Sequence, residues 1–155
     1  EVGMVQLNVT ALMEITKLFL PGMKERKWGR ILNVASTAAF QPGPQMAVYY
    51  ATKAFVLSFS QAIGFELKKS GVRVSCLCPG PTKSGFQKEA HMEKSKLFKG
   101  LTMDAETVAA TGYRGLLRGK PLIVPGMRNK ILIFVVRFAP RRLVLWIVWR
   151  AQKEG

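Results

Sequence analysis

Short apolar segments alternate with longer helical patterns along this chain, and that order constrains the fold more than any other feature. The apolar segments are bounded by Gly, Pro or Ser and occupy residues 30–35, 72–78 and 122–124. Apolar positions at helical spacing cover residues 5–25, 47–69 and 104–117. Strands that are apolar throughout are buried on both faces, and helices between them act as crossovers. We therefore predict an α/β fold with a parallel sheet.

The composition agrees with one folded unit. The chain has 155 residues, of which 48% are hydrophobic and 21% charged, a balance typical of a globular core rather than of disorder. We place one domain at residues 1–126 and a basic, apolar helical extension at 127–155. The formal net charge is +15, and residues 114–155 carry +9 of it. Such an excess indicates an anionic partner, either lipid, nucleic acid or an acidic protein surface.

The extension allows two interpretations. Its apolar runs at 131–136 and 143–149 are too short for a membrane-spanning helix. Trp146 and Trp149 beside arginines suit a helix lying on a membrane surface. The other interpretation, which we prefer, packs this helix on the body or on a second subunit. We expect a cytoplasmic protein, with peripheral membrane contact left open, and no nucleic-acid binding because no recognised motif accompanies the charge.

Cysteine and histidine usage excludes several site classes. Cys76 and Cys78 are the two cysteines, two apart in a predicted strand, so we expect buried, reduced thiols. His91 is the single histidine, which excludes a multi-histidine metal site, and we expect no metal. It lies in a Lys- and Glu-rich stretch and is expected to be a solvated surface residue.

Tyr49 and Lys53 are the most informative pair in the sequence. Their spacing of four, near the start of a predicted helix, places both on one helical face. An ammonium beside a phenol favours phenolate, so we expect a lowered tyrosine pKa and acid/base capability near neutral pH. Tyr50 is three residues from Lys53 and could claim the same role. A buried tyrosine and a solvated lysine remain the alternative interpretation.

Three other polar segments accompany this pair. Ser36 ends the first predicted strand, and residues 79–84 (Pro-Gly-Pro-Thr-Lys-Ser) directly follow the second. The carboxyl ends of parallel strands are where open α/β sheets hold their ligands. Asn8 is a polar amide among apolar residues of the first helix.

Together these segments resemble the short-chain dehydrogenase/reductase family, and bacterial members in particular. The matching stretches are Leu7-Asn8-Val9, Asn33-Val34-Ala35-Ser36, Tyr49-Tyr50-Ala51-Thr52-Lys53 and Cys78-Pro79-Gly80-Pro81-Thr82-Lys83-Ser84. Their order and spacing follow the family's Asn…Ser…Tyr-x-x-x-Lys tetrad and its Pro-Gly segment. The gap of thirteen residues after Ser36 selects Tyr49 over Tyr50. The resemblance implies a Rossmann-like sheet and covers about residues 1–126.

The resemblance implies a reaction and its residues. Tyr49 would be the catalytic acid/base, and Lys53 would lower its pKa and hold the nicotinamide ribose. Ser36 would hydrogen-bond the oxygen of a carbonyl or alcohol substrate, and Asn8 would anchor a water. The residues lining the nicotinamide, besides Tyr49 and Lys53, would be Pro79, Gly80, Thr82 and Ser84. NAD(P)(H) would supply the hydride, with NAD and NADP not distinguished. The loops at 37–46 and 83–102 reveal no substrate identity.

One family feature is absent. The glycine-rich turn Thr-Gly-x-x-x-Gly-x-Gly, which holds the cofactor pyrophosphate, does not occur in the sequence. We therefore expect a fold truncated at its amino end, weak dinucleotide binding and no turnover by this chain alone. Helices 5–25 and 47–69 would form a homo-oligomer interface by the same resemblance. The runner-up function is a non-catalytic membrane-surface or protein-interaction module derived from a reductase.

Overall fold

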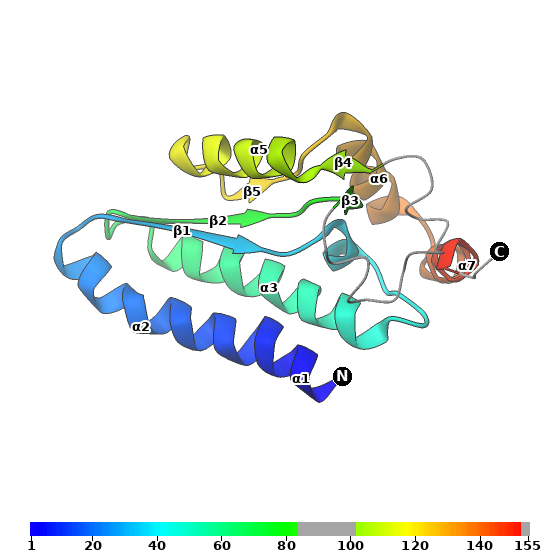
Figure 1. The fold of residues 1–155 in the computed structure, drawn as a ribbon, viewed down its shortest axis with the longest axis horizontal. Helices are drawn as coiled ribbons and strands as arrows, with labels where there is room; N and C mark the ends of the chain where they lie inside the picture. The colour runs from blue at the N-terminus through cyan, green and yellow to red at the C-terminus, as the bar shows by residue number, and fades with distance from the viewer. Residues whose placement is uncertain (84–101, 153–155) are drawn as a thin grey trace.

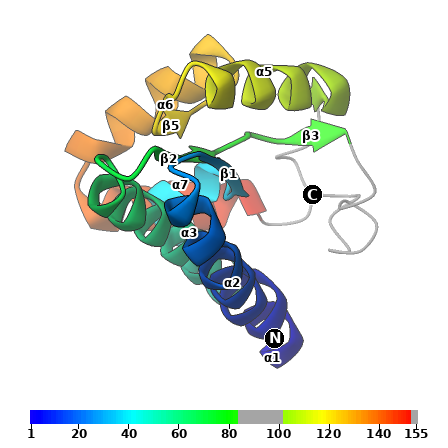
Figure 2. The same ribbon diagram turned by 90° about the vertical axis from the view of Figure 1, so that its left-hand side faces the viewer.

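A three-layer α/β arrangement is seen in the computed structural model, which describes residues 1–83 and 102–152 (Figure 1). The main sheet is parallel, in the order β1-β2-β5, with β2 between its two neighbours. Its strands are β1 (Gly29–Val34), β2 (Val72–Leu77) and β5 (Leu122–Ile123). Two helices, α2 (Leu12–Glu25) and α3 (Ala47–Glu66), cover one face, and α5 (Ala105–Leu117) covers the other (Figure 2). The predicted fold class is confirmed.

The strands and α5 begin and end close to their predicted limits. Each strand is displaced by one residue at most at either end from its prediction. Helix α5 starts one residue after its predicted limit because Asp104 is its N-cap: the Asp104 carboxylate accepts a hydrogen bond from the Thr107 amide at 2.7 Å. A second, two-stranded parallel pair, β3 (Thr82–Lys83) with β4 (Met103–Asp104), was not predicted.

The long helix α3 stops three residues before its predicted end. It gives way after Glu66 to a turn that leads to Gly71, whose φ is +78°. A side chain at this position would collide with the Lys27 carbonyl oxygen, since an added Cβ would lie 1.9 Å from it. Gly71 therefore permits both the left-handed turn and the close approach of two chain segments.

The first helix differs most from prediction. It begins at Val2 and is interrupted by a π-helical turn, η1 (Gln6–Ala11), between α1 (Val2–Val5) and α2. The predicted end at residue 25 is confirmed, because α2 continues through Pro21 to Glu25. Pro21 and Lys17 are both exposed, so the Lys17 carbonyl that loses its helical partner can be hydrated.

The core lies between β2 and the long helix α3. Val56 of α3 and Cys76 and Cys78 at the end of β2 are fully buried in one cluster with Ala35 and Leu57. Both thiols are free, with their sulfur atoms 3.8 Å apart. The expectation of buried, reduced cysteines is confirmed.

The predicted extension forms two helices, α6 (Met127–Phe138) and α7 (Arg141–Gln152). Both lie near the carboxyl ends of β1 and β2 (Figure 1). One face of α7 packs on the body, because Val144 and Val148 share a buried cluster with Ala38 and Tyr50. Within the described part of the chain, no helix has both the length and the apolar character that crossing a membrane requires.

Candidate active site

Ser36 ties together the carboxyl ends of β1 and β2. It lies just beyond β1 and caps the short 3₁₀ helix η2 (Thr37–Phe40), since its Oγ accepts a hydrogen bond from the Ala38 amide at 3.1 Å. The same hydroxyl donates to the Pro79 carbonyl at 3.5 Å, and that carbonyl also accepts from the Thr37 amide at 2.8 Å. These hydrogen bonds hold Ser36 beside the Pro-Gly segment.

Tyr49 and Lys53 lie in the first two turns of α3, facing Ser36 and β1. The Ser36 side chain is near enough to the Tyr49 phenol to lower its pKa through hydrogen bonding. The Lys53 ammonium lies 5.8 Å from the centre of the Tyr49 ring and donates to the Val34 carbonyl at 3.1 Å. The structure therefore brings three of the four predicted catalytic residues together at the end of β1.

The ionisation of Tyr49 differs from the sequence-based expectation. Burial raises the pKa of Tyr49, and the hydrogen bond from Ser36 only partly opposes that effect. The expected lowering of the Tyr49 pKa by Lys53 is wrong for this structure, because desolvation of the buried phenol is the largest effect and raises this pKa. Desolvation also lowers the pKa of Lys53. The phenol is thus held in its neutral, proton-donating form.

Asn8 reaches the site through a residue that the sequence analysis did not single out. It lies in the π-helical turn η1, and its Nδ2 donates to the Thr52 hydroxyl at 3.2 Å. Thr52 precedes Lys53 in the sequence, and its side chain is buried. Its hydroxyl donates in turn to the Tyr49 carbonyl at 2.8 Å. π-Helical turns concentrate at functional sites, where they turn a side chain out of register. The position of Thr52 inside the Tyr-x-x-x-Lys motif was the sequence signal that could have identified it as a site residue.

Tyr50 occupies a different face of α3. Its ring packs against Gly43, where an added Cβ would lie 2.2 Å from the ring, and its hydroxyl accepts a hydrogen bond from Gln152 Nε2 at 2.8 Å. Burial raises the pKa of Tyr50 as well. Tyr50 therefore anchors α7, whereas its neighbour Tyr49 faces Ser36.

The Pro-Gly segment contacts α6. An added Cβ on Gly80 would lie 2.5 Å from Asn129 Oδ1, so a larger residue here would require the Asn129 side chain to move. Asn129 Nδ2 donates to the Pro125 carbonyl at 2.7 Å, and Thr82 donates to the Gly80 carbonyl at 2.9 Å. Asn129 is a further residue that sequence reasoning missed. The predicted cofactor residue Ser84, and also His91, lie outside the described residues.

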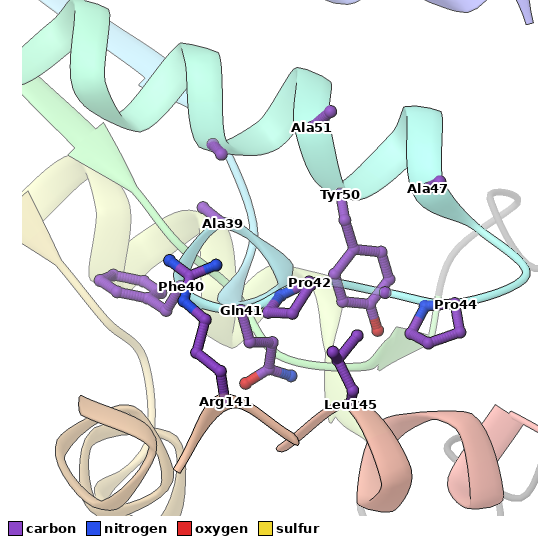
Figure 3. Close-up of a pocket in the computed structure, with 12 residues that line it drawn as sticks. Ala39, Phe40, Gln41, Pro42, Pro44, Ala47, Tyr50, Ala51, Arg141 and Leu145 are labelled. Atoms are coloured by element: carbon purple, nitrogen blue, oxygen red, sulfur yellow. The ribbon is translucent and has the colours of Figure 1, made fainter. Parts of the chain in front are cut away.

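A cavity of about 480 Å³ adjoins this site without including its polar residues. It lies between α3, the segment that follows η2, and α7, and Tyr50, Arg141 and Leu145 project towards it (Figure 3). Its lining is otherwise mainly apolar: Ala39, Phe40, Gln41, Pro42, Gly43, Pro44, Ala47, Ala51 and Ala54. Tyr49, Ser36 and Lys53 do not line it.

The comparisons with known proteins agree with this geometry. The profile of the family described as short chain dehydrogenase matches residues 3–95. Among curated proteins, D-beta-hydroxybutyrate dehydrogenase of Cupriavidus necator is 38% identical over 78 residues, which are 50% of this chain and 30% of that protein. Very-long-chain 3-oxoacyl-CoA reductase of Laccaria bicolor is 47% identical over 73 residues, 47% of this chain and 22% of that protein.

Solved structures show the same likeness. A short-chain dehydrogenase from Sphingobium yanoikuyae in complex with NADPH is similar with a TM-score of 0.73 and 27% identity, over 86% of this chain and 53% of that one. A short-chain dehydrogenase from Burkholderia cenocepacia in complex with NADP has the same TM-score at 23% identity, over 88% and 55% of the two chains, and supports the fold alone. The chain therefore matches under a third of the length of these curated relatives and about half of these structures.

Proposed function

Because the chain belongs to the short-chain dehydrogenase family, a family of oxidoreductases, we propose that it carries the reaction centre of an NAD(P)(H)-dependent enzyme that interconverts a carbonyl and an alcohol. The observation that carries this proposal is the convergence of Ser36, Tyr49 and Lys53 at the carboxyl end of β1. This is the edge at which α/β sheets hold their ligands.

Tyr49 is the proton donor of the proposed reaction. In the reducing direction, it gives its phenolic proton to the carbonyl oxygen of the substrate as that oxygen gains negative charge. Its raised pKa keeps the phenol protonated at neutral pH, as an acid requires. Ser36 lies within hydrogen-bonding reach of the same phenol and holds the substrate oxygen beside it.

The residues around Lys53 suit the nicotinamide end of a dinucleotide. An ammonium has three donors, and the Val34 carbonyl accepts from one of them. The remaining donors are suited to the ribose hydroxyls. Backbone and hydroxyl groups of Pro79, Gly80 and Thr82 lie at the neighbouring strand end, beside β2. The cofactor supplies the hydride, and these residues orient it.

For the pyrophosphate of the dinucleotide, the sequence offers no comparable set of binding residues. The glycine-rich turn that binds phosphates at a helix N-terminus is absent from the sequence. We therefore infer that these 155 residues alone bind dinucleotide weakly and do not turn over. Isothermal titration calorimetry with NADPH and NADH tests this inference, and micromolar binding of either would overturn it.

A 3-oxygenated acyl chain is the substrate class to test first. Two of the similar curated proteins are named for a β-hydroxy acid and for a 3-oxoacyl thioester, which both carry oxygen on the third carbon. This proposal rests on those names and on the acid/base site that such a ketone or alcohol requires.

Substitution of the two adjacent tyrosines tests the reaction centre. The measurement is NADPH- or NADH-dependent reduction of 3-oxoacyl substrates and simple ketones by a chain with the phosphate-binding half of a family member joined before Glu1. We expect Tyr49→Phe to lower turnover by about 10²- to 10⁴-fold, the usual contribution of a general acid. Tyr50→Phe is the matched control because it removes the same hydroxyl one residue away. Similar losses from both variants, with both folded, would contradict the assignment of Tyr49.

A further inference from the structure

The outward surface of α6 carries an apolar stripe that the fold leaves uncovered. Met127, Ile131, Phe134 and Phe138 recur at helical spacing and are 67%, 57%, 65% and 70% exposed. They lie opposite the inward side of α6, which is formed by Asn129, Ile133 and Val136. Four large apolar side chains in solvent on one helix are a feature of an interaction surface.

Helix α7 also has an exposed apolar side. Its inward side is occupied, because Val144, Val148 and Gln152 are buried against the body. Leu143, Trp146 and Ile147 project from the other side and are exposed. The Arg150 guanidinium lies over the Trp146 ring, 5.1 Å from its centre, so a cation and an aromatic ring share this side.

Basic residues flank the apolar stripe, and no acidic residue accompanies them. On a helical projection, Arg128 falls on one side of the α6 stripe, and Lys130 and Arg137 fall on the other. All three are exposed. The sequence contains no Asp or Glu from residue 107 to residue 153. We call the combined surface the tail outer face; its residues are Met127, Arg128, Lys130, Ile131, Phe134, Arg137, Phe138, Arg142, Leu143, Trp146, Ile147 and Arg150.

We propose that the tail outer face binds the surface of an anionic lipid membrane. An apolar stripe bordered by cations matches a bilayer interface, where acyl chains accept the stripe and phosphate headgroups meet the cations. Tryptophan and arginine side chains are also favoured at the level of the lipid headgroups, where an apolar body and a polar end are both accommodated. A second copy of this surface would bring like charges together, which opposes pairing through it. The membrane is thus the occupant whose charge complements the face.

This proposal is independent of the proposed reaction. It requires only that α6 and α7 keep their inward contacts while their outward side chains enter the lipid interface. Because the contacting side chains are already exposed, binding does not require the buried cluster around Val144 and Val148 to open. The packed tail and the lipid-bound tail are therefore one conformation.

Co-sedimentation of the full chain with vesicles tests the proposal. We expect binding to vesicles of mixed phosphatidylcholine and phosphatidylserine, weakening as salt screens the charges, and little binding to phosphatidylcholine alone. Phe134→Ser/Phe138→Ser should weaken binding by roughly tenfold or more, because it removes two large apolar groups from the interface. Leu18→Ser/Phe19→Ser is the matched control, since both residues are exposed on α2.

The cations are tested separately. Arg128→Gln/Arg137→Gln should weaken binding to the anionic vesicles, whereas Lys17→Gln/Lys24→Gln should leave it near the unsubstituted level. Equal binding to neutral and anionic vesicles would overturn the proposal. Equal losses from the tail and α2 variants would also overturn it. So would a change in oligomeric state on Phe134→Ser/Phe138→Ser without any vesicle binding, since it would assign the face to a protein contact.

Discussion

The first turns of α3 and the tail helices α6 and α7 use their polar groups in opposite ways. Around Tyr49, the side chains of Ser36, Thr52 and Lys53 each hydrogen-bond another group of the protein. In the tail, the cations of the tail outer face are exposed on helices whose inward sides carry apolar or amide side chains. Satisfied polar groups position one another for chemistry, whereas outward cations beside apolar side chains are available to a partner.

Removing the Lys53 ammonium from the region around Tyr49 should have the largest effect of these predictions, and that effect is on turnover. In a chain supplied with a phosphate-binding half, we expect Lys53→Met to lower turnover by about 10²-fold, because it removes the donors proposed to position the nicotinamide ribose. Lys68→Met, which removes the same charge near the far end of the helical segment, is the control and should leave turnover unchanged. Steady-state kinetics with both variants measures this, and an unchanged rate for Lys53→Met would contradict the proposed role.

Truncating the buried side chains of α7 should lower the stability of the fold rather than the rate of the proposed reaction. Val144→Ala and Val148→Ala each remove two methyl groups from a buried cluster and should lower the free energy of unfolding by about 2 kcal/mol. Ile147→Ala, on the exposed side, should cost much less. Urea unfolding of the three variants measures the difference. Equal effects at all three positions would mean that α7 does not pack through Val144 and Val148.

The hydrogen bond between Tyr50 and Gln152 joins α3 to α7, so the effects of substituting these two residues on stability should not be additive. Gln152 Oε1 is buried without a partner among the described residues, so Tyr50→Phe leaves the whole amide unsatisfied and should cost about 1–3 kcal/mol. Adding Gln152→Leu removes that buried amide, and the double variant should be more stable than Tyr50→Phe alone. A double-mutant cycle by chemical unfolding measures this, and strictly additive effects would exclude the coupling.

Alkaline pH should reveal the buried phenols through a smaller effect. The pKa of Tyr49 is raised above 10.0 in the folded chain, so the folded state holds its proton where the unfolded state has lost it. Stability should therefore fall as pH rises past 10.0, and Tyr49→Phe should reduce this fall. Lys53 acts with the opposite sign, since its folded pKa lies below 10.5, and comparison with Lys53→Met isolates it. An identical pH dependence in wild type and Tyr49→Phe would contradict the burial of this phenol.

Local signals accounted for most of the elements that carry the site. Apolar runs bounded by glycine, proline or serine located the strands within one residue, and apolar residues at helical spacing located α5 within one residue. These features depend on neighbours within a few residues, so sequence spacing reveals them. The π-helical turn at Gln6–Ala11 was not predicted, because the spacing of apolar residues does not distinguish it from an α-helix.

Local sequence by itself determined that Tyr49 and Lys53 share a helical face and that Ser36 lies at the carboxyl end of a strand. Only the tertiary structure decided how these groups ionise and what lies against them. Burial of Tyr49, the Val34 carbonyl that receives Lys53, and the bond from Asn8 to Thr52 all depend on segments at least 13 residues apart. The contact of Gln152 with Tyr50 spans 102 residues. Desolvation and hydrogen bonding act between atoms that the fold brings together, and their outcome for an ionisable group cannot be read from its spacing in the chain.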